Sequence, residues 1–153
     1  MNLNEQFERA LIIAAEAHIG QTRLNGEPYS FHFLRVSFKC KTMIAKIAAI
    51  LHDVIEDCDR DADYLLSHGI DEQIVDIVMI LTHNKDESYE FYIERVARHV
   101  TAIEVKLCDL EDNTDILQLP ELTDRFATRL QKYHKTYNLL KDRLLALQFL
   151  LRS

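Results

Sequence analysis

Apolar residues recur every three or four positions along most of the chain, which is the spacing of an amphipathic α-helix. Near the start, Phe7, Ala10, Leu11 and Ala14 follow this spacing and predict a helix from about residue 3 to residue 19. The sequence lacks stretches of apolar–polar alternation bounded by turn residues, which would predict strands. The pattern therefore predicts an all-α fold.

Residues that start and stop helices divide the rest of the chain. Residues 20–27 are predicted to form a loop, and Pro28 suits the first position of the next segment. Gly69 is expected to end a short helix in the left-handed conformation, and Asp71 to cap the helix that follows. Further helices are predicted over residues 28–38, 42–56, 62–66 and 71–81, from residues 88 and 102 onward, and over 122–151. We expect a single compact domain over residues 1–153, a bundle of about seven or eight helices.

One predicted helix carries polar residues in a segment that is otherwise apolar enough to be buried. His52 and Asp53 are followed by Glu56 and Asp57, and residues three or four apart share a helix face. Buried carboxylates are costly without a partner, and a divalent cation held by imidazole and carboxylate groups would remove that cost. The alternative is an amphipathic helix with a core histidine and with acidic residues on its solvated face.

Two other predicted helices offer further ligands of the same kind. His32 opens an apolar stretch, so its imidazole is expected in the first turns of a helix. Asp109 stands where a core residue would be expected, with Lys106 one turn before it and Asn113 one turn after it. A histidine, a His-Asp pair and a distant aspartate together are the ligands of an HD-superfamily metal site.

Three motifs resemble those of the RelA/SpoT-type alarmone hydrolases, whose catalytic domain is of the HD type. They are residues 17–32, which include AHIGQTR and GEPYSFH, residues 48–57, AAILHDVIED, and residues 105–109, VKLCD. The resemblance spans roughly residues 7–140. It implies an HD-type helical bundle and metal-dependent hydrolysis of the 3′-pyrophosphate of a guanosine nucleotide such as (p)ppGpp.

The resemblance also implies a role for each matching residue. The implied ligands of one divalent ion, typically Mn²⁺, are His32, His52, Asp53 and Asp109. Glu56 and Asp57 would position and activate the attacking water. Arg23 would lie against the guanine base and Asn113 would help to hold the nucleotide. Lys106 is a further candidate for contact with the substrate.

The chain departs from the family pattern near these motifs. Phe33 replaces the proline that usually follows the first metal histidine, and Leu24 replaces a basic residue after the base-stacking arginine. Where the last motif continues with Arg, a hydrophobic residue and His, this chain has Leu110, Glu111 and Asp112. Losing one positive charge and gaining two negative ones is expected to work against a substrate as anionic as guanosine tetraphosphate.

Three functions therefore stay open at this point. The first is a (p)ppGpp-like 3′-pyrophosphohydrolase. The second is an HD phosphohydrolase for another nucleotide or phosphoester, which residues 110–112 favour somewhat. The third is a non-catalytic nucleotide- or metal-binding module, against which Glu56 and Asp57 argue.

Composition limits the partners of the chain. A net charge of −7 argues against nucleic acid, because binding its backbone requires many Lys and Arg residues. No apolar run approaches the ~20 residues of a membrane span, and the amino terminus lacks a secretory signal. Three widely spaced cysteines fit reduced thiols, so we expect a cytoplasmic protein acting on a small phosphorylated nucleotide. An aromatic-rich helix that is expected to be exposed leaves a homodimer open.

The last predicted helix carries several polar residues along one side, namely Arg125, Arg129, Lys132 and Tyr133. A charged stripe on a long helix is usually a solvated face. We therefore expect these residues to face solvent or another subunit and not to take part in catalysis.

Overall fold

The computed structural model describes all residues from Met1 to Ser153. It contains nine α-helices and one short 3₁₀ helix, and an isolated bridge between Thr22 and Pro28 is its only β pairing. The helices are α1 (Leu3–Ala17), α2 (Ser30–Lys39), α3 (Met43–Leu51), α4 (Val54–Asp57), α5 (Ala62–Ser67), α6 (Glu72–Leu81), α7 (Tyr89–Val96), α8 (Val100–Asn113), η1 (Ile116–Gln118) and α9 (Asp124–Arg152). The predicted all-α bundle is confirmed.

Local hydrogen bonds explain where several helices begin and end. The Ser88 side chain accepts from the Phe91 N–H at the start of α7, and Gly69, with φ of +82°, ends the turn after α5. Asp71 does occupy the position before α6, but its side chain makes no capping bond. It accepts instead from the Gln6 amide at 2.7 Å, which ties α1 to α6.

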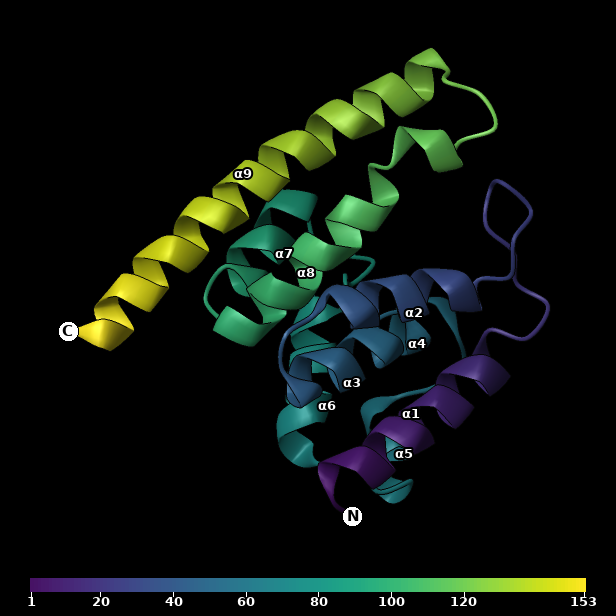
Figure 1. Cartoon of the computed structure of the whole chain (residues 1–153), viewed down its shortest axis with the longest axis vertical. Helices are drawn as coiled ribbons and strands as arrows, with labels where there is room; N and C mark the ends of the chain where they lie inside the picture. The colour runs from purple at the N-terminus through teal and green to yellow at the C-terminus, as the bar shows by residue number, and fades with distance from the viewer.

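Helix α3 forms the centre of the core because it is apolar on almost every side. Six of its nine residues are buried, and it packs against α1, α2, α6 and α8. Figure 1 shows α3 enclosed by these helices, with α1 on the side of the N-terminus and α8 on the side of α9. The helices that carry the predicted ligands therefore surround a single rigid element.

The prediction of one helix over residues 42–56 is wrong in one respect. Helix α3 ends at Leu51 and α4 begins at Val54, so His52 and Asp53 lie at a break between two helices. The ring N–H of His52 donates to the Ala49 carbonyl at 2.5 Å. In an uninterrupted helix the Asp53 N–H would occupy that carbonyl, so the side chain competes with the helical bond. This break accounts for nine helices where eight segments were predicted.

Helix α9, at 29 residues, is the longest element and packs mainly against α8. It runs diagonally along one side of the molecule in Figure 1, and its last turns extend past α7 and α8. Leu145, Phe149 and Leu151 in these turns are largely exposed. Neither α9 nor any other helix combines the length and the hydropathy that crossing a membrane requires.

Candidate active site

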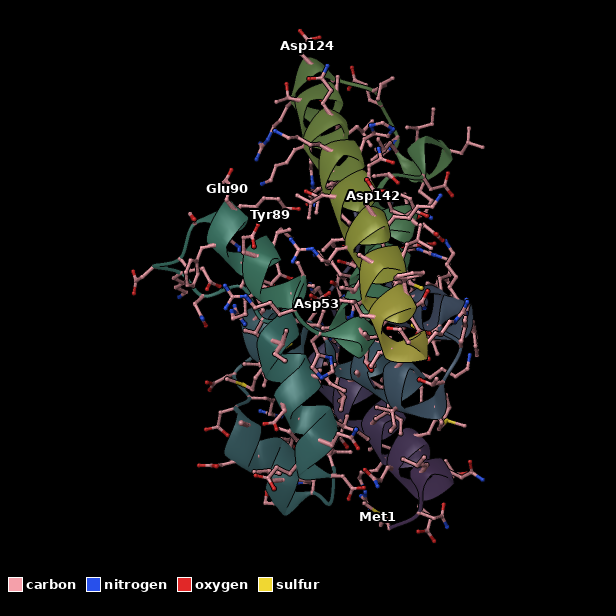
Figure 2. All side chains as sticks on the ribbon, turned by 90° about the vertical axis from the view of Figure 1, so that its left-hand side faces the viewer. Met1, Asp53, Tyr89, Glu90, Asp124 and Asp142 are labelled. Atoms are coloured by element: carbon pink, nitrogen blue, oxygen red, sulfur yellow. The ribbon has the colours of Figure 1, made fainter.

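The four predicted metal ligands come together near the middle of the molecule, where Figure 2 labels Asp53. Ligand atoms of His32, His52 and Asp109, all three buried, lie within 4.8 Å of one another. The Asp53 Oδ2 lies 3.0 Å from the His52 Nε2 and 3.7 Å from the His32 Nε2. Helix α2, the α3–α4 break and helix α8 thus bring together side chains that are up to 77 residues apart in sequence (109 − 32).

The hydrogen bonds of the two histidines leave the same ring nitrogen free in each. Carbonyl and carboxylate oxygens only accept, so the His52 Nδ1 donates to Ala49 and the His32 Nδ1 donates to Asp112 at 2.6 Å. In the neutral rings Nε2 then carries a lone pair, directed at the cluster. The His52 Nε2 is buried and makes no well-formed hydrogen bond, although the Asp53 Oδ2 lies 3.0 Å away. A lone pair that faces carboxylate oxygens is unfavourable unless a cation occupies the cluster.

The spacing of the donor atoms fits a divalent cation. Ligands about 2.1 Å from one ion are about 3.0–3.5 Å apart in octahedral or tetrahedral geometry. The His32 Nε2 lies 3.2 Å from the Asp109 Oδ1, and the His52 Nε2 lies 3.5 Å from the same oxygen. Two imidazole nitrogens with two carboxylates suit Mn²⁺, Fe²⁺ or Zn²⁺ better than Ca²⁺, which prefers an all-oxygen shell.

Neighbouring side chains keep the two aspartates ionised. Burial alone would raise the pKa of Asp53, but without a bound metal the adjacent His52 is protonated, and its charge outweighs burial and lowers this pKa to about 2. Burial alone would also raise the pKa of Asp109, but the Lys106 ammonium outweighs it and holds this pKa well below its usual range. The Tyr29 hydroxyl donates a hydrogen bond to Asp53, although the sequence motifs gave Tyr29 no role. Both carboxylates are therefore available as negatively charged ligands.

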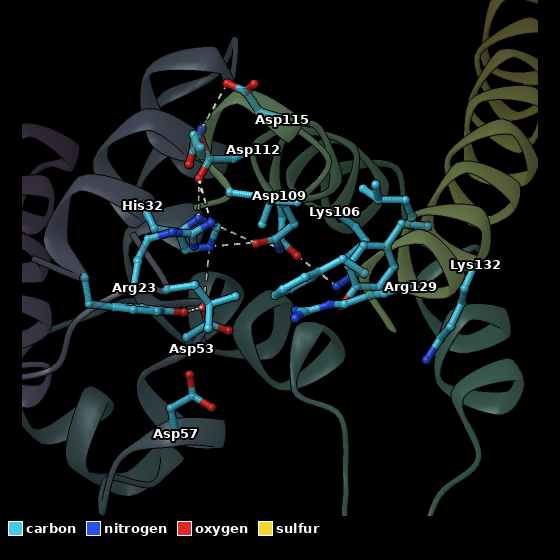
Figure 3. Close-up of a pocket in the computed structure, with 18 of the residues that line it drawn as sticks. Arg23, His32, Asp53, Asp57, Lys106, Asp109, Asp112, Asp115, Arg129 and Lys132 are labelled. Atoms are coloured by element: carbon cyan, nitrogen blue, oxygen red, sulfur yellow. Dashed lines mark hydrogen bonds and ion pairs between the residues drawn. The ribbon is translucent and has the colours of Figure 1, made fainter. Parts of the chain in front are cut away.

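The three predicted substrate-binding residues all line the same pocket. The Lys106 ammonium lies 2.8 Å from the Asp109 Oδ2, and the Asn113 amide donates to the Asp109 Oδ1 at 2.7 Å. The Arg23 guanidinium donates to the Asn113 side chain at 3.3 Å. Lys106 thus makes its main contact with a predicted ligand, whereas Arg23 lies on the His32 side of the pocket, with its Nη2 3.6 Å from the Asp112 Oδ2 (Figure 3).

Glu56 and Asp57 lie on α4, beside the cluster and open to the pocket. The Asp57 N–H donates to the Asp53 carbonyl at 2.9 Å, so the expected one-turn spacing survives the break in the helix. Neither carboxylate forms an ion pair with His32 or His52, whereas Asp53 pairs with both. Partial burial, followed by the charge of Asp53, raises the pKa of both. This combination suits residues that accept a proton without binding the metal.

The pocket has a volume of about 650 Å³, and α9 forms its far wall. Arg129, Lys132 and Tyr133 line that wall, and Arg129 and Lys132 are also exposed to solvent, as expected. Figure 3 shows Arg129 and Lys132 on the opposite side of the pocket from His32. The wall lies opposite the metal cluster because α9 packs on α8, the helix that carries Asp109.

The two acidic residues that depart from the family pattern lie in different environments. Glu111 points away from the pocket, where it pairs with Lys39 at 3.4 Å and accepts from the Tyr137 hydroxyl. Asp112 does face the site, but the Arg35 guanidinium binds it at 2.6 Å. The expected repulsion of an anionic substrate by these two charges is therefore largely offset.

Comparison with known proteins supports the motif assignment. No model of a protein family matches the chain. A guanosine-3′,5′-bis(diphosphate) 3′-pyrophosphohydrolase of Vibrio cholerae is 35% identical over 121 residues, which cover 72% of this chain and 17% of the relative. The enzyme of the same name from Borreliella burgdorferi is 33% identical over 147 residues, covering 80% and 22%. The chain thus spans about a fifth of the length of these relatives.

A solved structure matches over nearly the whole chain. It is described as a metazoan ortholog of SpoT that hydrolyzes ppGpp, and it superposes with a TM-score of 0.74 at 25% identity, covering 91% of both chains. The chain is an HD-type domain related to the RelA/SpoT hydrolases. The relationship confirms the family that the three motifs indicated, and this HD-type domain has the all-α fold of its structural neighbour.

Proposed function

We propose that this HD-type domain is a metal-dependent hydrolase that removes the 3′-pyrophosphate of a (p)ppGpp-like nucleotide. One observation carries the proposal, namely the convergence of His32, His52 and Asp109 at the edge of a pocket, with Asp53 beside both histidines. The relatives are named as hydrolases of the same nucleotide class. His32, His52, Asp53 and Asp109 would hold one divalent ion, for which we propose Mn²⁺.

The chain supplies the groups that such a hydrolysis needs. When bound, a divalent ion would act as a Lewis acid toward a phosphoryl oxygen and make a water molecule more acidic. Glu56 and Asp57 would position the attacking water and accept its proton. Their raised pKa values bring them closer to the range of a useful general base. Lys106 would hold Asp109 in place and add positive charge on the phosphate side of the pocket.

The remaining walls of the pocket suit a nucleotide with phosphates at two ends. A volume of about 650 Å³ lies in the usual range for small-molecule sites. Arg23 would stack on the base, and Asn113 would hydrogen-bond to the nucleotide. Arg129 and Lys132 would attract the phosphates that lie away from the metal, because they face the pocket from its opposite wall.

A second substrate class has one observation in its favour. Leu24, which stands where the family has a basic residue, lines the pocket mouth and is 62% exposed. The missing charge favours a nucleotide with fewer phosphates than guanosine tetraphosphate. A non-catalytic binding module is the weakest of the three functions, since Glu56 and Asp57 both face the pocket without pairing with either histidine.

The wider setting of the protein is also proposed. Net charge of −7 and free cysteines favour a cytoplasmic protein that binds small nucleotides and not nucleic acid. The exposed leucines and phenylalanine at the end of α9 favour a homodimer.

A product assay tests the proposal. Purified Mn²⁺-loaded protein is incubated with a panel of nucleotides that includes guanosine tetraphosphate and nucleoside monophosphates, and released pyrophosphate is measured separately from phosphate. We expect pyrophosphate from the tetraphosphate, and none from the Glu56→Gln variant. Release of phosphate from a monophosphate alone would support the second substrate class, and no release from any nucleotide would support a binding module.

A further inference from the structure

Asp112 occupies an unusual position for a residue that is not itself a predicted ligand. Its side chain is 1% exposed, and its Oδ2 accepts the Nδ1 proton of His32 at 2.6 Å. Histidines that bind metals usually donate their second N–H to a carboxylate or carbonyl, which fixes the tautomer and makes the other nitrogen a better ligand. Asp112 is therefore the outer hydrogen-bond partner of His32, and the Ala49 carbonyl is the corresponding partner of His52.

A set of hydrogen bonds fixes the Asp112 carboxylate in turn. Arg35 donates to it through Nε at 2.6 Å and through Nη2 at 3.3 Å, which is the paired contact that guanidinium groups make with carboxylates. The Gln118 amide donates to the other side at 3.1 Å. The same Arg35 Nη2 also binds Glu27 at 2.6 Å. The buried Asp112 carboxylate thus links four parts of the chain, namely α2, the loop before it, α8 and η1.

These contacts explain how the chain accommodates Leu110 and Asp112, which differ from the family pattern. The family pattern has a histidine at the position of Asp112 and an arginine at the position of Leu110. Here Leu110 is fully buried among apolar residues, and a guanidinium reaches the site from α2 through Arg35. The acidic residue is thus accompanied by a cation from another helix, and its Oδ2 contacts His32 at 2.6 Å and lies 3.6 Å from the Arg23 guanidinium.

We propose that Asp112, clamped by Arg35, is a positioning residue that orients His32 and increases the affinity of the site for its divalent ion. The inference rests on the proposed metal site. Loss of an outer-shell partner typically lowers metal affinity about tenfold to a hundredfold. Asn at position 112 can still accept from His32, but it lacks the charge and would turn an amide N–H toward Arg35 or Gln118.

The test measures Mn²⁺ affinity by isothermal titration calorimetry on the full chain. The Asp112→Asn variant is compared with the native chain and with Glu111→Gln, which removes the same charge from the adjacent residue on the outer face. We expect Asp112→Asn to bind Mn²⁺ at least tenfold more weakly and Glu111→Gln to match the native chain. Arg35→Gln keeps the hydrogen bond between Asp112 and His32 but removes the guanidinium that holds Asp112. We therefore expect the Mn²⁺ affinity of this variant to fall by a smaller factor.

Circular dichroism of the metal-free variants shows whether each one folds. Should Asp112→Asn fail to fold, Arg35→Gln decides the question, and unchanged affinity in that variant would overturn the inference. Native affinity in a folded Asp112→Asn variant would overturn it as well. A native chain that binds no Mn²⁺ would refute the proposed metal site, and the role of Asp112 with it. This outcome can be told apart from a native chain that binds Mn²⁺ and an Asp112→Asn variant that binds it equally well, which would refute only the role of Asp112.

Discussion

The Lys106 ammonium lies 2.8 Å from the Asp109 carboxylate one turn away on α8, and the two side chains are 14% and 6% exposed. Burial alone would lower the pKa of Lys106, but the charge of Asp109 outweighs it and holds this pKa well above its usual range. The pair is therefore ionised, and each member compensates the other. Asp109 has a second partner whenever a divalent ion is bound, whereas Lys106 does not.

We predict that Lys106→Met destabilises the metal-free protein more than the metal-loaded protein. Removing one member of a buried ion pair costs about 3–5 kcal/mol, because the other charge stays buried. A divalent ion would compensate the Asp109 charge and reduce this loss. Denaturant unfolding in EDTA and in Mn²⁺ measures the difference, with Lys141→Met on the exposed face of α9 as the matched control. Equal destabilisation in both conditions would show that Asp109 does not contact the ion.

We predict that Glu56→Gln and Asp57→Asn each abolish turnover and leave the metal content unchanged. Both residues face the pocket beside the cluster, and neither forms an ion pair with His32 or His52. Rate constants and elemental analysis of the purified variants separate the two effects. Asp59→Asn, an exposed acid just after α4, serves as the control. Loss of the metal in both variants would assign these residues as ligands.

We predict that the acid limb of the kcat profile lies above the ordinary pKa of the residue that acts as the base, about 3.9 for Asp and about 4.3 for Glu. The base works as a carboxylate, so the rate rises with pH through its pKa, and partial burial and the charge of Asp53 raise that pKa in Glu56 and Asp57. Steady-state rates at saturating nucleotide and Mn²⁺ define the limb. A limb below pH 4 would argue against both residues as the base.

We predict that Leu24→Lys lowers the KM for guanosine tetraphosphate about two- to fivefold at low ionic strength. The new ammonium would stand at the pocket mouth, and an exposed charge pair contributes at most about 1 kcal/mol. Added salt should reduce the effect. Leu122→Lys, at a leucine that is similarly exposed but outside the pocket, should leave KM unchanged. A KM unaffected by Leu24→Lys would show that this departure does not set substrate preference.

Local signals in the sequence predicted most of the fold. Periodicity located the helices within a few residues, and Ser88 and Gly69 act at helix ends as expected. The break at His52 escaped prediction because it depends on a bond between a side chain and the main chain inside an apolar run that otherwise favours a helix.

Only the site residues that belong to the three motifs could be predicted from the sequence. The motifs identified side chains that meet at the cluster, because their residue types and spacing are specific to metal chemistry. The roles of Arg35 and of the cationic wall on α9 depend on the packing of helices that are distant in sequence. Charge counting alone could not show that Arg35 lies beside Asp112.

The central claim is that His32, His52, Asp53 and Asp109 hold one divalent ion. Elemental analysis after dialysis measures bound Mn²⁺ per chain in the native protein and in Asp53→Ala, with Asp142→Ala on the exposed side of α9 as the control. The account predicts one ion per chain in the native protein and in the control, and at least a tenfold loss of affinity in Asp53→Ala. Full metal content with native affinity in Asp53→Ala would contradict it.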